Sequence, residues 1–179
     1  FAMASACEVV LACDDEDEAQ RLAQEAVAEV QRIEHKFSRY RADSIVSRIN
    51  ASAGGEAVEC DGETVSLLDY ADTLHRSSDG LFDITSGLLR RAWNFRAGKI
   101  PSQKEIDLLL PHIGWGKLTW HNPNLSFTRR GMELDFGGYV KEYGADCAAA
   151  VALQQGIQHG LIELGVQLLV VGAQGGVGD

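Results

Sequence analysis

A glycine pair, Gly137-Gly138, lies within residues 134–146, between an apolar segment and a helix-like segment that carries a tyrosine and carboxylates. Adjacent glycines let a backbone come close to a ligand, and the first amides of a following helix attract phosphates through its positive dipole end. This pattern favours a site for an anionic cofactor. A Gly-Gly turn before a helix is more often only a tight connection, so the glycines alone leave both interpretations open.

Two aspartates and a tyrosine are further candidates for ligand binding. Asp83 and Asp135 each lie beside apolar residues and a turn. There a carboxylate can accept a hydrogen bond from a ribose hydroxyl, a flavin ring N–H or a backbone amide. An aspartate that caps its own turn is an equally good interpretation of each. Tyr40 follows Phe37-Ser38-Arg39 and can either stack on an aromatic ring or cover the core.

Several classes of site have little support. The histidines lack H-E-x-x-H or any other close metal spacing, which disfavours a zinc site, and no G-x-S-x-G elbow indicates a serine hydrolase. The glycine-rich residues 172–179 have no helix after them, so we discount a dinucleotide loop there. A formal net charge of -10 argues against a nucleic-acid partner.

The elements that must position these residues follow from hydrophobic periodicity. The 179 residues, 45% hydrophobic, suffice to bury the core of one domain or of a large part of a bigger one. Apolar spacing predicts helices over residues 16–37, 45–50, 61–77, 101–110 and 141–154, and strands over residues 6–13, 116–120, 125–128, 132–135, 156–163 and 168–171. Without regular βαβ alternation, this order predicts an α+β fold with a largely antiparallel sheet flanked by helices.

The ends and the cysteines carry less information. The sequence begins at Phe1 without an initiating Met, a signal peptide or an apolar stretch long enough to span a membrane, so we expect the native ends to lie outside it. Four cysteines form no C-x-x-C pair, and most are expected to be buried thiols.

Taken in order, five blocks resemble the ApbE-type flavin transferases, the FAD:protein FMN transferases once called thiamine-biosynthesis lipoproteins. Each block alone is weakly specific, but together they span nearly the whole chain. The resemblance implies an ApbE-like fold and one flavin-transferase region over residues 1–179. The blocks are A-M-A-S at 2–5, F-S-R-Y at 37–40 with S-R-I-N at 47–50, G-L-F-D-I-T-S-G at 80–87 with Trp93 beyond, L-D-F-G-G-Y-V-K-E-Y-G-A-D at 134–146, and H-G-L-I-E-L-G at 159–165.

The resemblance also implies an activity. Family members bind FAD with Mg²⁺, split its pyrophosphate and transfer FMN to a Thr or Ser hydroxyl of an acceptor flavoprotein, releasing AMP. The carbonyl of Gly138 would be a ligand of the magnesium ion, for which a hard oxygen donor is suitable. The residues that would contact FAD or line its pocket are Met3, Tyr40, Leu81, Phe82, Asp83, Asp135 and Lys141.

The sequence also departs from the family pattern. After residue 165 the family usually continues with Gly-Asp, whereas Val166-Gln167 follow here, and family members run on through a segment that supplies an Asp and a Thr to the metal. The region is therefore expected to be C-terminally incomplete, with weak FAD binding and little or no transfer. The alternatives are a family relative that only binds FAD or a protein partner, and a fold that binds no ligand. Many family members are periplasmic or membrane-anchored, and a homodimer is compatible with the resemblance.

Overall fold

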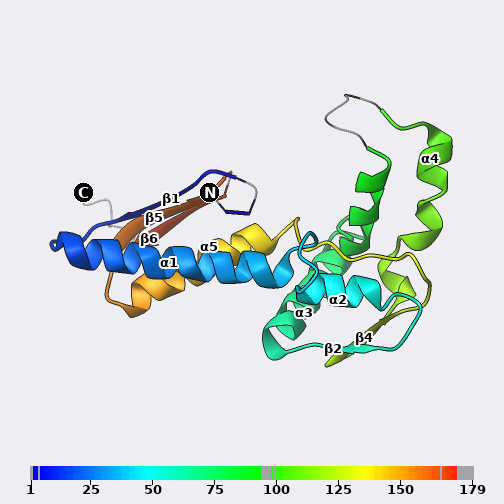
Figure 1. The fold of residues 1–179 in the computed structure, drawn as a ribbon, viewed down its shortest axis with the longest axis horizontal. Coiled ribbons are helices and arrows are strands. Elements are labelled where there is room, and N and C mark those ends of the chain that lie inside the picture. Colours follow the sequence, from blue (N-terminus) through cyan, green and yellow to red (C-terminus); the bar gives the residue numbers. More distant parts are fainter. Residues whose placement is uncertain (1, 4, 94–97, 99, 166, 173–179) are drawn as a thin grey trace. The chain divides into compact units, whose positions relative to one another are not determined.

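The computed structural model describes residues 2–3, 5–93, 98, 100–165 and 167–172. The chain divides into two compact units (Figure 1). Unit 1 comprises Phe1–Phe37 and Gly137–Asp179, and unit 2 comprises Ser38–Phe136. The single flavin-transferase region over residues 1–179 stays a prediction, because two compact units can belong to one functional region.

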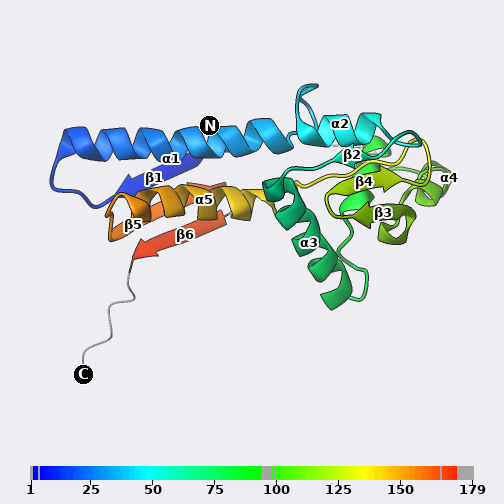
Figure 2. The same cartoon turned by 90° about the horizontal axis from the view of Figure 1, so that it is seen from below.

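Unit 1 is a three-stranded antiparallel sheet covered by two helices. The strands pair in the order β1-β5-β6. Helices α1 and α5 lie side by side against this sheet (Figures 1 and 2). The elements are β1 (Cys7–Leu11), α1 (Glu16–Phe37), α5 (Val140–Gln154), β5 (His159–Leu164) and β6 (Gln167–Gly172).

The sequence explains both helices of unit 1. In α1 the residues Leu22, Ala26, Val30, Ile33 and Phe37 recur every three or four positions and are buried, and acidic side chains occupy the first turn. The buried face of α5 carries alanines, whose small side chains allow α1 to pack closely against it. Among the described residues, no helix is both long enough and apolar enough to cross a bilayer.

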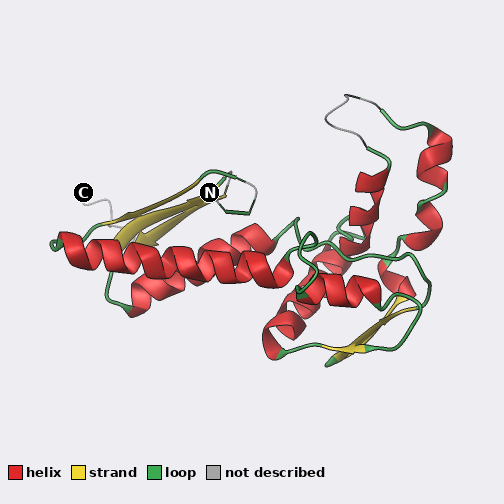
Figure 3. Cartoon of the chain, in the orientation of Figure 1, coloured by secondary structure: helices red, strands yellow, loops and turns green. Residues whose placement is uncertain are grey.

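Unit 2 has a second antiparallel sheet, in the order β2-β4-β3, together with helices (Figure 3). The helices with 3₁₀ geometry among the described residues are η1 (Ile84–Arg91), η2 (Leu110–His112) and η3 (Trp115–Lys117). The other elements are α2 (Ile45–Ala51), β2 (Val58–Glu59), α3 (Gly62–Ser77), α4 (Gln103–Asp107), β3 (Leu118–His121) and β4 (Asn124–Phe127). Across both units, helices with antiparallel sheets confirm the predicted α+β class.

One predicted strand is wrong, and the reason bears on the site. Residues 132–135 form no strand, although Met132, Leu134 and Phe136 alternate as fully buried side chains. A side chain supplies the backbone partners instead, because the Asn50 amide donates to the Leu134 carbonyl at 3.0 Å and accepts from the Leu134 N–H at 2.7 Å. The burial pattern of a strand is therefore present without a neighbouring strand.

Smaller differences concern the ends of elements. The two-residue strand β2 was not predicted, and α4 ends at Asp107, before the 3₁₀ helix η2, which contains Pro111. A capping box between Ser102 and Glu105 begins α4. The glycine-rich residues 173–179, which we discounted as a dinucleotide loop, lie outside the described residues.

Candidate functional site

In unit 2, Arg39 holds two of the predicted FAD contacts. Its Nη1 forms an ion pair with Oδ2 of Asp135, a residue 96 positions away in the sequence. Its Nη2 donates to the Tyr40 hydroxyl at 2.6 Å, and the guanidinium carbon lies 4.7 Å from the centre of the Tyr40 ring. We call Arg39, Tyr40 and Asp135 the Arg39 cluster.

Burial in this cluster is uneven. The side chains of Arg39 and Asp135 are 26% and 15% exposed, whereas Tyr40 is 78% exposed. Within the described residues, Nε of Arg39 is buried and has no hydrogen-bond partner. The guanidinium covers one face of the tyrosine ring, so the ring offers its other face to a planar ligand.

The position of Asp135 depends on a second segment, η1. The Asp135 N–H donates to the Ile84 carbonyl at 2.9 Å. A methyl group on Gly87 would overlap the Asp135 Cβ and lie 2.9 Å from its Oδ2 and 3.0 Å from its Cγ, closer than normal contacts. Gly87 is therefore needed for Asp135 to lie where Arg39 can hold it. Arg39 and Gly87 have no predicted role of their own, although both belong to blocks that resemble the ApbE-type flavin transferases.

Asp83 is bound within unit 2 as a helix cap. Its Oδ1 accepts from the Thr85 N–H at 2.8 Å and from the Thr85 hydroxyl at 2.6 Å, and its Oδ2 accepts from the Trp115 N–H at 2.8 Å. The Thr85 hydroxyl in turn accepts from the Gly114 N–H at 2.7 Å. Of the two interpretations that the sequence left open for Asp83, the capping role is present; contact with FAD stays a prediction.

The residues beside Asp83 complete this side of unit 2. Leu81 is 91% exposed, and the Phe82 N–H donates to the Ser78 hydroxyl at 2.8 Å. The Phe82 carbonyl lies 2.9 Å from Nδ1 of His75, whose ring stacks on Trp115 with centroids 5.9 Å apart. The hydrogen bond between the backbones of Asp135 and Ile84 brings the predicted pocket residues 81–83 next to the Arg39 cluster.

In unit 1, Met3 and Lys141 lie near the same turn. Met3 is buried, adopts a positive φ of 50°, and donates its N–H to Oε1 of Glu34 at 2.8 Å. The Lys141 ammonium is 3.3 Å from the hydroxyl of Ser5. Ser5 closes this turn through two backbone hydrogen bonds with Ala2. Lys141 is in the first turn of α5.

The glycine pair precedes that helix as predicted. Gly137 and Gly138 are exposed and neither has a positive φ, so backbone conformation does not require glycine there. The N-cap residue Tyr139 makes no side-chain cap, and burial raises the pKa of its hydroxyl. No hydrogen bond to the Gly138 carbonyl is present among the described residues.

The donors available to a magnesium ion are few. In the part of the chain that the structure describes, no three His, Cys, Asp or Glu side chains are grouped as metal ligands. Gly138 is exposed, and its carbonyl is a hard oxygen donor, which fits an ion that takes most of its ligands from phosphate and water. Gly138 as a metal ligand stays a prediction.

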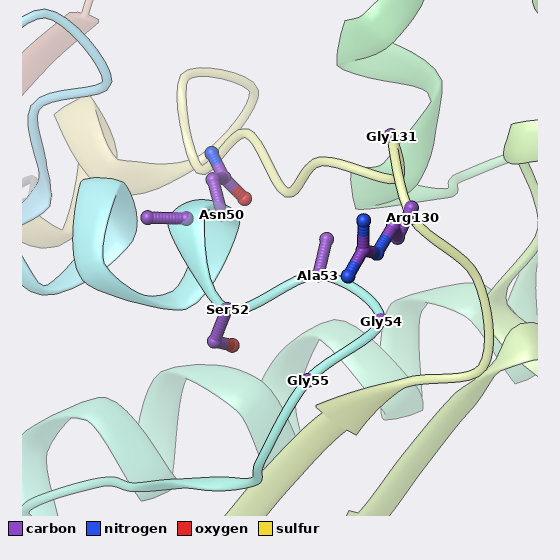
Figure 4. Close-up of a pocket in the computed structure, with 8 residues that line it drawn as sticks. Asn50, Ser52, Ala53, Gly54, Gly55, Arg130 and Gly131 are labelled. Atoms are coloured by element: carbon purple, nitrogen blue, oxygen red, sulfur yellow. The ribbon is translucent and has the colours of Figure 1, made fainter.

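Two other features are distinct from these clusters. A pocket of about 410 Å³ in unit 2 is lined by residues 50–55 and 130–131, with the Arg130 side chain beside the glycine loop (Figure 4). It contains none of the predicted FAD contacts. None of the four cysteines, all of which the structure describes, forms a disulfide, and only Cys60 is buried, so the expectation of mostly buried thiols is wrong. Burial, and next the charge of Asp61, raise the pKa of Cys60 to about 11, which makes it a poor nucleophile at neutral pH.

Comparison with known proteins gives consistent matches. The sequence matches the ApbE family over residues 3–178. An FAD:protein FMN transferase of Vibrio cholerae is 26% identical over 147 residues, covering 80% of this chain and 44% of that protein. One of Klebsiella pneumoniae is 27% identical over 168 residues, covering 92% of this chain and 52% of that protein.

Solved structures agree with the fold. The crystal structure of the ApbE protein of Thermotoga maritima has a TM-score of 0.86 and 28% sequence identity, covering 97% of this chain and 58% of that one. The flavin transferase ApbE of Vibrio cholerae, at 23% identity and a TM-score of 0.87, supports the fold alone. The chain thus spans about half the length of the relatives it matches.

Proposed function

This chain belongs to the ApbE family, and from that premise we propose that it provides a flavin-binding part of an FAD:protein FMN transferase. Relatives named as FAD:protein FMN transferases support a flavin-transfer enzyme in general. Because the chain spans about half their length, the complete activity is part of the proposal rather than a property of these residues alone.

The observation that carries the proposal is the Arg39 cluster. Tyr40 presents an exposed aromatic face, and the guanidinium that contacts it through one Nη atom holds the Asp135 carboxylate through the other. An isoalloxazine or adenine ring has the flat surface that stacks on such a face, where aromatic pairs contribute about 0.5–1.5 kcal/mol beyond area burial. Flavin and ribose also carry N–H and O–H groups that a carboxylate accepts.

The finer chemistry follows from the resemblance. In the proposed reaction a Thr or Ser hydroxyl oxygen of the acceptor attacks the FMN phosphorus of FAD. The P–O bond to AMP breaks, the hydroxyl proton leaves, and FMN stays attached through a phosphoester. Bound magnesium would offset negative charge on the diphosphate. We propose that the Gly138 carbonyl faces that ion, that Lys141 attracts phosphate as a cation, and that Met3 contacts FAD.

Titration of FAD fluorescence with the purified chain, with and without Mg²⁺, tests the binding step. We expect saturable quenching that Tyr40→Leu weakens by about tenfold, from lost stacking and packing. The control variant Tyr70→Leu removes another exposed tyrosine of unit 2 and should bind FAD like the wild type. Lack of any FAD binding by folded wild-type chain would overturn the proposal.

Transfer is tested separately by mass spectrometry. The chain is incubated with FAD, Mg²⁺ and an acceptor peptide that contains Thr or Ser, and the added mass of FMN on the peptide is the expected product. The alternative from the sequence is an FAD-binding or partner-binding relative without transferase activity. FAD binding that persists without Mg²⁺, together with unmodified peptide, would favour that alternative.

A further inference from the structure

Building on the proposed function, we propose that Arg39 is a positioning residue of the flavin site, which holds Asp135 and Tyr40 together in the geometry that binds FAD. No role in FAD binding follows for Arg39 from the family resemblance. Its contacts do point to one, because its two terminal nitrogens go to two different predicted FAD contacts.

The geometry of the guanidinium supports a positioning role. An arginine that serves only an ion pair commonly uses both Nη atoms, or Nε and one Nη, on the same carboxylate. Arg39 instead gives Nη1 to Asp135 and Nη2 to the Tyr40 hydroxyl, with its plane beside the Tyr40 ring. Movement of the guanidinium would therefore displace the carboxylate and the aromatic ring together.

The unsatisfied nitrogen supports the same inference. Nε of Arg39 is buried and has no partner among the described residues, an arrangement that costs folding free energy. A residue placed for folding stability alone would be expected to use this donor. Within the described part of the chain, Arg39 leaves Nε without a hydrogen-bond partner and keeps its contacts to Asp135 and Tyr40, so its placement favours the arrangement of those two side chains.

Charge gives the pair a second effect on the ligand. The whole chain has a formal net charge of -10, and without the positive charge of Arg39 the largely buried carboxylate of Asp135 would repel the FAD diphosphate more strongly. Arg39 neutralises Asp135 and makes the cluster compatible with an anion. Loss of Arg39 should therefore weaken FAD binding through both geometry and charge, and the charge effect should diminish as salt rises.

The test measures FAD affinity and the residual flavin fluorescence of the saturated complex for Arg39→Gln, Asp135→Asn and the double variant. We expect Arg39→Gln to weaken binding at least about tenfold and to raise the residual fluorescence. The double variant should bind no more weakly than the worse single variant, because both substitutions disrupt one unit. Arg39→Lys, which keeps the charge but cannot hold both partners, should give an intermediate affinity.

Arg41 provides the matched control. It lies two positions from Arg39 and pairs with Asp43 at 3.3 Å, with both side chains at least half exposed. Arg41→Gln should bind FAD within about twofold of the wild type, since exposed pairs contribute little. Thermal unfolding of each variant without ligand identifies those that stay folded, and Arg39→Lys keeps the test available if Arg39→Gln does not fold.

The outcomes separate this inference from the proposed function. If wild-type chain binds FAD while folded Arg39 variants bind equally well with unchanged fluorescence, the inference is wrong and the proposed function stands. Additive losses in Arg39→Gln and Asp135→Asn would also overturn the inference, because the residues would then act independently. If the wild-type chain does not bind FAD, the proposed function is wrong and the inference falls with it.

Discussion

Replacement of Gly87 by alanine should displace Asp135 without removing any group that we propose to touch FAD. The new methyl group would overlap the Asp135 Cβ and lie 3.0 Å from its Cγ, where carbon atoms normally stay about 3.5–4.0 Å apart. Asp135 or η1 must therefore move by about 0.5 Å or more. Either movement disturbs the ion pair with Arg39.

The size of the effect follows from these contacts. Overpacking of this kind costs about 1–3 kcal/mol of the free energy of unfolding. If the displaced carboxylate also loses one charge-assisted hydrogen bond to FAD, about 1.5–3 kcal/mol of binding free energy is lost, which weakens FAD affinity by about 10- to 150-fold. Both effects have the same cause, so they should appear together.

Chemical denaturation and FAD titration of Gly87→Ala measure the two quantities. Gly116→Ala is the matched control, because Gly116 also lies in a 3₁₀ helix without a positive φ, and its added methyl group would meet no atom within 4 Å. Gly116→Ala should be unchanged or up to about 1 kcal/mol more stable, through the unfolded state. A Gly87→Ala chain as stable as the wild type, with equal FAD affinity, would refute this account of Asp135.

Three other predictions concern groups outside the Arg39 cluster. Asp83→Asn should lower the free energy of unfolding by about 2 kcal/mol, measured by denaturation, since the carboxylate accepts from Thr85 and Trp115. In folded protein at pH 8, Cys60 should resist iodoacetamide in a mass assay, because its pKa is raised to about 11. Glu34→Ala should speed hydrogen exchange of the Met3 amide by about tenfold, because that amide loses its acceptor.

For each of these three predictions, a specific result would contradict it. The capping role of Asp83 would be wrong if Asp83→Asn had the same free energy of unfolding as Asp43→Asn, a control at an exposed aspartate. Rapid alkylation of Cys60 without denaturant would show that the thiol is not protected. The pKa of Cys60 is 9.0 ordinarily and about 11 in the folded protein, so the thiol loses its proton in the unfolded chain first. The free energy of unfolding should therefore fall as pH rises from about 9 towards 11. Glu25→Ala is the control, because the Glu25 side chain is on α1 and 40% exposed. If the Met3 amide exchanged at the same rate in Glu34→Ala as in Glu25→Ala, the contact between Met3 and Glu34 would be contradicted.

Local patterns in the sequence predicted the local structure well. The helix over residues 16–37 was predicted with both ends correct, because acidic residues mark its start and its buried positions keep helical spacing. The strand predicted over residues 132–135 failed for a non-local reason. Alternating burial requires only an extended segment against a core, and here the Asn50 amide, 84 residues away, satisfies the backbone of Leu134.

The candidate site shows the same limit. The motif blocks contain Arg39 and Gly87, yet no spacing within a block indicates that the guanidinium will reach Asp135, 96 positions away. The spacing also does not indicate that Asp135 will occupy the space where a side chain at Gly87 would lie. Such requirements arise only when the fold brings three distant segments together, so they were not accessible to pattern analysis of one sequence.

Asp83 and Asp135 illustrate how the structure separates two residues that the sequence could not. Each is a carboxylate beside apolar residues and a turn, and capping was an equal alternative for both. In Asp83 both oxygens accept from Thr85 or Trp115, so its charge is used to build unit 2. Asp135 instead pairs with Arg39, which is 96 positions away in the sequence, and lies beside an exposed tyrosine. A carboxylate whose oxygens accept from backbone amides stabilises the fold, whereas a carboxylate beside an exposed aromatic ring lies where a ligand stacked on that ring could donate to it. The flavin-binding role that the resemblance implies for both is therefore better matched by Asp135.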